Sequence, residues 1–269
     1  AYIAWGGEPL MRTHILDILQ HARALGLYTS IITNGIYLPE KAEKIAKLVD
    51  LTWVSIDHYS DYHDEMRGLK GTFERAVDGI TKLRRAGGRI AINCVLSRLN
   101  TDAVGKMAEF ARRLGVKLAF DLMEVFLGIN EEYALMASER RRLFEVVREF
   151  KRQGYPILNS YEYLEHPISR VKYSCAQPRV FIMVSEDGKI KPFWCQKTSR
   201  VLGDLRKQSL SEVLYSPSFK EFDGIMKGCN LCNNSSTVEA SVFYSTRRFL
   251  MNFYRLNNPY LKFILDFAL

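Results

Sequence analysis

The sequence predicts an α/β fold: an incomplete barrel of βα units with parallel strands, followed by a small C-terminal α+β domain. Strand-like apolar runs alternate with helical patterns up to about residue 153, as in a parallel sheet covered by helices. Polar residues share one face of several strands, which suits a barrel interior that holds a ligand better than a sheet buried on both faces. After Gly154 the composition changes. We therefore predict domains over residues 1–153, 154–241 and 242–269.

Five βα units make up the first predicted domain. Its strands are expected at residues 2–5, 28–33, 51–56, 89–96 and 116–122. Its helices carry apolar residues at helical spacing, and their start signals are Pro9, Pro39, Thr72, Thr101 and Ser138. The chain opens with Ala1 inside the first strand, so we expect a further βα unit to be missing before it.

Polar and glycine residues gather at the carboxyl ends of these strands, where barrels of βα units hold their active sites. They are Gly6, Gly7, Asn34, Asp57 and Asn100. The stretch Gly6-Gly7-Glu8-Pro9 predicts a bare-backbone turn whose N–H groups lie beside one fixed negative charge. It suits a small ligand that carries an ammonium group and a carboxylate. The alternative is an ordinary βα turn with a helix-capping acid.

The charge and composition exclude several classes of protein. The formal net charge is +8, but basic runs such as Arg140-Arg141-Arg142 are typical of solvated helix faces, and we find no nucleic-acid-binding signature. An anionic substrate or membrane surface stays open. No apolar run of about 18 residues is present, so no transmembrane helix is expected. The odd count of five cysteines argues against a disulfide framework and fits a reducing cytosol.

The cysteines fall into two groups. Cys94 lies in a strand, on the side that packs against helices, and is interpreted as a small buried hydrophobic residue. Cys175 and Cys195 flank a predicted hairpin, and Cys229 and Cys232 form a CxxC. Four such thiolates suit a zinc ion or an iron–sulfur cluster equally by spacing. The alternative is a redox CxxC with two unrelated cysteines.

The rest of the second region contains fewer residues that suggest a binding or catalytic role. Residues 180–184 and 189–194 are predicted to form the hairpin, and short helices are expected near residues 210–214 and 219–226. The tail, residues 242–269, interleaves aromatic and basic residues. It either packs its apolar faces over the folded domains or lies as an anchor in the headgroup layer of an anionic membrane.

Several motifs together resemble the radical S-adenosylmethionine (radical SAM) enzymes. "GGEPL" follows the first strand, "TNG" the second and "SIDH" the third, and "HDEMRGLKGTFERAVDGITKLRRAG" and "INCVLSRLN" are also similar to that superfamily. The second region resembles the SPASM or twitch type of C-terminal extension. The resemblance implies a TIM-like partial barrel. The family's CxxxCxxC, which holds the catalytic 4Fe-4S cluster, is absent from this sequence, so the chain by itself is expected to be inactive.

The resemblance also implies which residues bind cofactors. Those expected to contact S-adenosyl-L-methionine are Gly6, Gly7, Glu8, Pro9, Thr33, Asn34, Ser55, Asp57, Asn93 and Arg98. Those expected to hold one auxiliary 4Fe-4S cluster are Cys175, Cys195, Cys229 and Cys232. No catalytic acid or base can be assigned from the sequence.

The function implied is reductive cleavage of S-adenosylmethionine to a 5′-deoxyadenosyl radical that modifies a peptide, a lipid or another small molecule. An electron donor such as flavodoxin or ferredoxin is the implied partner, with no nucleic acid. The expected location is the cytoplasm, with peripheral membrane contact through the tail as a variant. The alternative function is a non-catalytic zinc- or iron–sulfur-binding module.

Overall fold

The computed structural model of the chain describes residues 1–125, 128–193, 195 and 197–244. These residues divide into two compact units. Unit 1 comprises Ala1–Met123 and Glu132–Asn159, and unit 2 comprises Glu124–Glu131 and residues 160–244. The segment that follows the last strand of unit 1 therefore belongs to unit 2. The domain boundaries predicted at residues 153 and 241 stay predictions, and most of the predicted tail lies outside the described residues.

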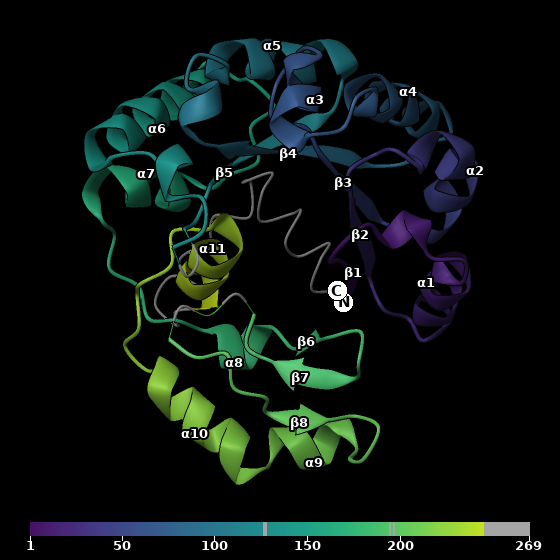
Figure 1. Ribbon diagram of the computed structural model, residues 1–269, viewed down its shortest axis with the longest axis vertical. Helices are drawn as coiled ribbons and strands as arrows, with labels where there is room; N and C mark the ends of the chain where they lie inside the picture. Colours follow the sequence, from purple (N-terminus) through teal and green to yellow (C-terminus); the bar gives the residue numbers. More distant parts are fainter. Residues whose placement is uncertain (126–127, 194, 196, 245–269) are drawn as a thin grey trace. The chain divides into compact units, whose positions relative to one another are not determined.

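Unit 1 is built on a five-stranded parallel sheet (Figure 1). The strands, in spatial order, are β1 (Tyr2–Ala4), β2 (Thr29–Thr33), β3 (Leu51–Ser55), β4 (Ile90–Leu96) and β5 (Lys117–Leu122). Because the spatial order follows the chain order, right-handed crossovers place every connecting helix on the same face. A doubly wound sheet would instead reverse its strand order. The predicted incomplete barrel of βα units is confirmed.

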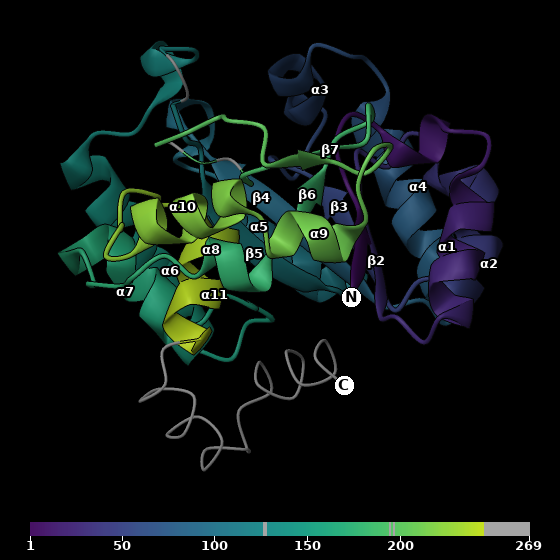
Figure 2. The ribbon, with the colours of Figure 1, turned by 90° about the horizontal axis from the view of Figure 1, so that it is seen from below.

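The helices of unit 1 cover one face of this sheet (Figure 1). They are α1 (Ile15–Ala24), α2 (Leu38–Leu48), α4 (Thr72–Arg85), α5 (Val104–Leu114) and α6 (Ala137–Arg152). A short helix, α3 (Tyr62–Arg67), and three 3₁₀ turns, η1 (Pro9–Met11), η2 (Arg98–Asn100) and η3 (Glu131–Tyr133), complete the connections. Figure 2 shows α1, α2 and α4 side by side. The α2–α4 contact needs Gly79, since a Cβ there would lie 2.7 Å from Leu38.

All five predicted helix starts differ from the structure. The helix expected at Pro9 begins only at Ile15, because Pro9 instead begins the 3₁₀ turn η1, and the helix expected at Pro39 begins at Leu38. Thr72 and Ser138 lie inside their helices, and the residues before those helices are Gly71 and Met136. The helix expected at Thr101 begins only at Val104, because the Ser97 and Asn100 side chains first close a capping box around η2. The loop after β4 is therefore longer and more ordered than the sequence pattern predicted.

The two faces of the sheet differ in burial. On the helix-covered face Ile31, Val54, Ile92 and Cys94 are completely buried, which fits the interpretation of Cys94 as a small apolar residue. Neighbouring residues in a strand point to the opposite face. There Ser55 and Asn93 are only half-buried. We call this second face, which also carries Trp53, the open face.

The open face is closed at the amino end of the strands. Leu51, Ala91, Ala119 and Leu158 form a buried cluster there, with Tyr28 and Trp53 packed against it. Leu158 reaches this place because residues 156–159 run beside β5: Leu118 and Ile157 form a parallel bridge, and the Asn159 amide bonds both backbone groups of Phe120. The polar residues of the open face consequently lie at its carboxyl end.

Unit 2 combines short helices with a three-stranded antiparallel sheet of order β6-β7-β8. Its elements are α7 (Tyr161–Ser169), α8 (Gln177–Val180), β6 (Met183–Val184), β7 (Lys189–Lys191), β8 (Gly203–Asp204), α9 (Leu210–Leu214), α10 (Pro217–Met226) and α11 (Ser235–Tyr244). Six buried residues form its core: Ile190, Cys195, Leu202, Val213, Phe222 and Met226. Among the described residues, no helix combines the length and hydrophobicity that a membrane span needs.

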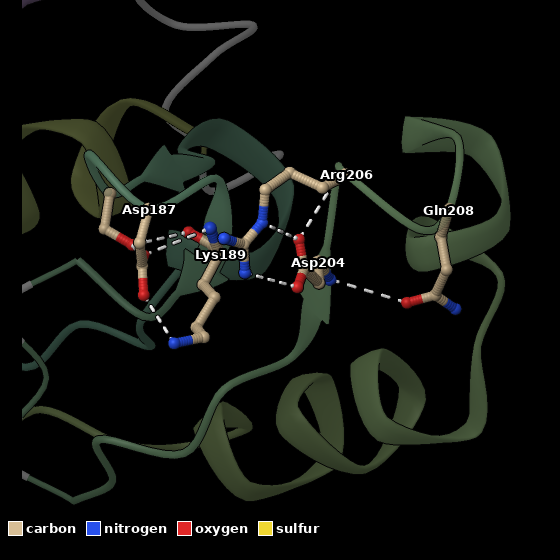
Figure 3. A network of polar contacts seen from close by, with 6 residues as sticks. Asp187, Lys189, Asp204, Arg206 and Gln208 are labelled. Atoms are coloured by element: carbon tan, nitrogen blue, oxygen red, sulfur yellow. Dashed lines mark hydrogen bonds and ion pairs between the residues drawn. The ribbon is translucent and has the colours of Figure 1, made fainter.

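The predicted hairpin is present but shorter than expected, and it gains β8 as a third strand. Charged side chains form ion pairs at the turn of the hairpin and beside β8 (Figure 3). Asp187 pairs with Lys189 at 2.5 Å, and Asp204 accepts two hydrogen bonds from the Arg206 guanidinium. The Arg206 contact lowers the pKa of Asp204 to about 2. The expected short helices correspond to α9 and α10, whereas α3, α7 and α11 had no counterpart in the prediction.

Candidate active site and metal centre

The Gly6-Gly7 turn lies directly after β1. Both glycines have positive φ angles, +95° and +55°, which disfavour residues with a side chain. A Cβ added at either position would meet no atom within 4 Å, so the space beside the turn is open. The turn thus presents bare backbone to its surroundings, as the sequence predicted.

Glu8 ties this turn to the end of β2. Its Oε1 accepts hydrogen bonds from the Leu10 N–H at 3.0 Å and the Thr33 hydroxyl at 2.7 Å, and its Oε2 accepts one from the Asn34 N–H at 2.7 Å. Thr33 Oγ1 in turn accepts from the Gly35 N–H. Glu8 is also the N-cap of η1, followed by Pro9 at its first position. Its carboxylate therefore holds the loop after β1 against the loop after β2.

Asp57 organises the loop after β3. Its Oδ1 accepts a hydrogen bond from the Val95 N–H at 2.9 Å, which extends the β3–β4 pairing, and its Oδ2 forms an ion pair with Arg67 at 2.6 Å. Its carbonyl oxygen accepts from the buried Asn100 amide at 2.8 Å. Asp57 is almost fully buried, so the ion pair with Arg67 is an important part of its stabilisation.

His63, on α3, completes the same loop. Its Nδ1 accepts the Asp57 N–H at 3.1 Å, so a neutral ring carries its proton on Nε2. The ring is completely buried, and Nε2 has no hydrogen-bond partner among the described residues. Burial lowers the pKa of His63 to about 4, although the nearby Asp57 charge opposes this shift. The imidazole is therefore neutral at pH 7.

Ser55 and Asn93 are register partners on the open face, one at the end of β3 and the other in β4. In the described part of the chain neither side chain has a hydrogen-bond partner, and both are half-buried. Arg98 is engaged elsewhere: it forms an ion pair with Glu139 at 3.6 Å and donates to the Glu132 carbonyl.

The predicted ligand-contact residues thus separate into two kinds. The first kind is engaged within unit 1: Pro9 is buried in η1, and hydrogen bonds or ion pairs are made by the side chains of Glu8, Thr33, Asn34, Asp57 and Arg98. The Gly6-Gly7 backbone, Ser55 and Asn93 remain open toward the carboxyl end of the sheet. This edge can bind an elongated polar ligand through backbone N–H groups after β1 and side chains two and three strands away, in β3 and β4.

The second candidate site contains the four cysteines of unit 2. Cys195, Cys229 and Cys232 are buried, and Cys175 is half-buried. The Cys175 N–H donates to the Cys229 carbonyl at 2.8 Å, which brings the first cysteine to the CxxC. Cys195 Sγ lies 3.7 Å from Met226 Sδ, inside the core of the unit. We call these residues the four-cysteine site.

Backbone contacts fix the segment Cys229–Asn234, which we call the ligand loop. The Gly228 N–H before it donates to Ser174 Oγ at 3.0 Å. The Tyr173 hydroxyl donates to the Cys232 carbonyl at 2.8 Å, and the Tyr173 ring packs edge-on against His166 of α7. On its other side the loop bonds the carboxylate of Glu124, which follows β5.

The thiols lie close enough to interact electrostatically. Burial, then Glu124, then the other three cysteines raise the pKa of Cys232 to about 12. Burial likewise raises the pKa of Cys175, with contributions from Cys229 and Cys195. No three His, Cys, Asp or Glu side chains in the described ranges are grouped so that they could hold one metal ion. The ligands of a four-iron cluster are spaced more widely than those of one ion, so this finding concerns single ions.

The sequence pattern missed the residues that support both sites. Arg67 and His63 lie in a short helix that the pattern did not predict. Glu124 and Tyr173 contact the ligand loop from distant parts of the chain. The one sequence signal for Glu124 is that it follows the carboxyl end of a strand. The same signal identified Asp57.

Comparison with protein families identifies the class of protein. Residues 2–111 match the model of the radical SAM superfamily, and residues 175–234 match that of the SPASM iron–sulfur cluster-binding domain. The chain belongs to the radical SAM superfamily and carries a SPASM domain. S-adenosylmethionine and iron–sulfur clusters are the cofactors that these two domains imply.

Curated relatives include an AdoMet-dependent heme synthase of Methanosarcina barkeri, 30% identical over 236 residues, which cover 77% of this chain and 66% of the relative. A PqqA peptide cyclase of Methylocella silvestris is 26% identical over 249 residues, covering 84% of this chain and 65% of the relative. The chain thus spans slightly less than two thirds of these relatives.

A solved structure with the same fold is Streptococcus suis SuiB bound to S-adenosylmethionine. Its TM-score is 0.70 at 17% identity, and the match covers 85% of this chain and 60% of SuiB. At this identity the likeness establishes the fold, which agrees with the parallel sheet of unit 1.

Proposed function

We propose that this chain supplies the S-adenosylmethionine-binding sheet and the auxiliary cluster domain of a radical SAM enzyme that modifies a peptide. The observation that carries the proposal is the Gly6-Gly7 turn. Glu8 holds it at the carboxyl edge of the sheet, with open space over both glycines. When bound, the cofactors supply one-electron cleavage of the sulfonium and a 5′-deoxyadenosyl radical.

The residues of unit 1 bind and orient S-adenosylmethionine in this proposal. The Gly6 and Gly7 backbone meets its amino-acid end, and Ser55 and Asn93 offer a hydroxyl and an amide on the open face. Glu8, Pro9, Thr33 and Asn34 shape the first two loops, and Asp57 and Arg98 shape the loops after β3 and β4. The chain contains no CxxxCxxC, so none of its cysteines is assigned to the catalytic cluster.

The residues of unit 2 fit one auxiliary 4Fe-4S cluster. Four thiols from three segments lie within electrostatic reach of one another, three of them buried. Thiolate is the ligand that such clusters require. The coordination of the cluster would be complete with four protein ligands: Cys175, Cys195, Cys229 and Cys232. The cluster would then transfer electrons or support the fold, and it would leave no iron site open for substrate.

A peptide is the proposed substrate because one of the relatives is named for peptide chemistry, the PqqA peptide cyclase. The heme synthase relative shows that this family is not confined to peptides. A lipid substrate is the alternative that the aromatic tail suggests, and most of that tail lies outside the described residues. The proposed electron donor is a flavodoxin or ferredoxin, and the proposed location is the cytoplasm.

Cofactor binding is tested by calorimetry on the complete gene product, reconstituted anaerobically. We expect Gly6→Ala and Gly7→Ala to weaken S-adenosylmethionine binding at least about tenfold, or about 1.4 kcal/mol. Gly26→Ala is the matched control, because Gly26 also has a positive φ, +73°, with open space around it, but follows α1. Equal affinities in the wild type and all three variants would contradict the assignment.

The competing function is a non-catalytic module with structural zinc at the four-cysteine site. It predicts a colourless protein with about one zinc ion and no iron, whereas the proposed enzyme is brown and contains iron and sulfide. Metal analysis of anaerobically purified protein distinguishes the two.

A further inference from the structure

The Glu124 carboxylate lies directly against the ligand loop, and neither the resemblance nor the family comparison assigns it a role. One of its oxygens, Oε1, accepts hydrogen bonds from the Asn233 N–H at 2.5 Å and the Asn234 N–H at 3.0 Å. These are the two residues that follow Cys232. Glu124 comes from the segment after β5, more than a hundred positions earlier in the chain.

A simpler role is conceivable for these contacts. Asn233 and Asn234 precede α11, and the Asn234 side chain already accepts the Thr237 N–H at 2.8 Å, as a helix cap does. Glu124 could therefore just hold the start of α11. That role needs a hydrogen-bond acceptor but no charge, because an amide oxygen accepts the same two N–H groups.

The surroundings of the loop make the charge itself significant. Cys232 is buried, and the groups that contact its backbone are neutral: the Tyr173 hydroxyl bonds its carbonyl, and the His166 ring packs on Tyr173. Lys197, a cation near this site, acts on Cys175 and donates to the Ile225 carbonyl. A fixed negative charge beside a buried thiolate ligand is screened less than one at the surface.

We propose that Glu124 is a positioning residue of the auxiliary site, which fixes the turn after Cys232 and holds a negative charge there that favours the oxidised cluster. Reduction adds one electron to the cluster, so an adjacent carboxylate disfavours it. Hydrogen bonds, net charge and burial around the thiolates are the factors that set such potentials. This inference rests on the proposed cluster at the four-cysteine site.

The test is a potentiometric titration of the 269-residue chain, reconstituted anaerobically with iron and sulfide. Because the chain holds one four-cysteine site, the titration follows one cluster, with dithionite as reductant and EPR as readout. The variants are Glu124→Gln, which keeps an acceptor but removes the charge, and Glu124→Asp, which keeps the charge. Glu221→Gln is the matched control, since Glu221 lies in unit 2 but is more than half exposed and pairs with Arg200.

We expect Glu124→Gln to raise the ratio of reduced to oxidised cluster about tenfold at a fixed potential, a midpoint about 59 mV more positive for one electron. Glu124→Asp and Glu221→Gln should stay near the wild type. A wild-type midpoint in Glu124→Gln would overturn the inference. So would a folded Glu124→Gln that binds no iron, because the charge would then be needed to assemble the cluster rather than to set its potential. If the wild type itself assembles no iron–sulfur cluster, the proposed function of unit 2 fails.

Discussion

At the carboxyl edge of the unit 1 sheet, the loops are fixed by side chains of the same unit: Glu8 bonds the end of β2, and Asp57 bonds β4 and Arg67. In unit 2 the cysteines come from three segments: one backbone hydrogen bond joins Cys175 to Cys229, and side chains from positions 124, 173 and 174 bond the backbone around the CxxC. Unit 1 has strands of up to seven residues, whereas those of unit 2 have two or three. In unit 1 the carboxylates themselves therefore hold the loops, whereas in unit 2 few contacts join the cysteine segments, and a bound cluster is expected to stabilise unit 2 more than unit 1.

The largest expected effect is the loss of the proposed cluster. Cys229→Ser should remove most of the bound iron and shift amides of unit 2 to fast hydrogen exchange, because ligand binding there contributes to folding free energy. Amides of β2 to β5 should stay protected. Cys94→Ala is the control. Cys94 is buried in unit 1, so this variant protein should retain its full iron content. Unchanged protection in unit 2 of the iron-free variant would show that this unit folds without metal.

The next effect concerns the ion pair of the β3 loop. Arg67→Ala leaves the Asp57 carboxylate nearly buried without its cation, and should lower the free energy of unfolding by about 3 kcal/mol. Lys82→Ala removes an exposed pair with Asp78 and should cost no more than about 1 kcal/mol. Urea denaturation of unit 1, followed by circular dichroism, measures both. Equal costs would mean that the Asp57 loop is held by its other bonds.

His63 makes the stability of unit 1 depend on pH. Its pKa is about 4 in the folded chain against 6.5 for an ordinary histidine, so between these values the unfolded chain binds more protons. Stability is therefore complete above pH 6.5 and falls as the pH falls toward 4, by about 3 kcal/mol at most. His63→Gln removes the titrating ring and keeps an acceptor for the Asp57 N–H. The difference in stability between pH 7 and pH 4.5 should be smaller in this variant, and an identical pH profile would exclude His63 as the source.

The smallest effect on stability is expected at Ser55 and Asn93. Because neither side chain has a partner among the described residues, Ser55→Ala and Asn93→Ala should change the free energy of unfolding by no more than about 0.5 kcal/mol. Asn100→Ala is the structural control, since its buried amide bonds Asp57 and Val95, and it should cost about 2 kcal/mol. If the first two variants also retain full S-adenosylmethionine affinity, the open face takes no part in binding.

Much of unit 1 could be predicted from local pattern. Each strand was located to within one residue at either end, because alternating burial and flanking glycine or polar residues mark strands well. The helix starts were predicted less well, and α1 differs most because the η1 turn separates Pro9 from Ile15. Thr72, Thr101 and Ser138 are good caps, but nearby backbone and side-chain contacts supplied others. Helices α3, α7 and α11 were missed because short helices are stabilised by tertiary packing more than by propensity.

By itself the sequence determined the order of strands and helices, the Gly6-Gly7 turn and the grouping of four cysteines. These depend on residue type and on spacing along the chain. Only the tertiary structure decided that Glu8 and Asp57 hold loops with their carboxylates, that Ser55 and Asn93 stay open, and that Glu124 contacts the ligand loop. Such contacts join residues far apart in the chain, and a carboxylate in the sequence carries no mark of which distant N–H group or cation it will meet when the chain folds.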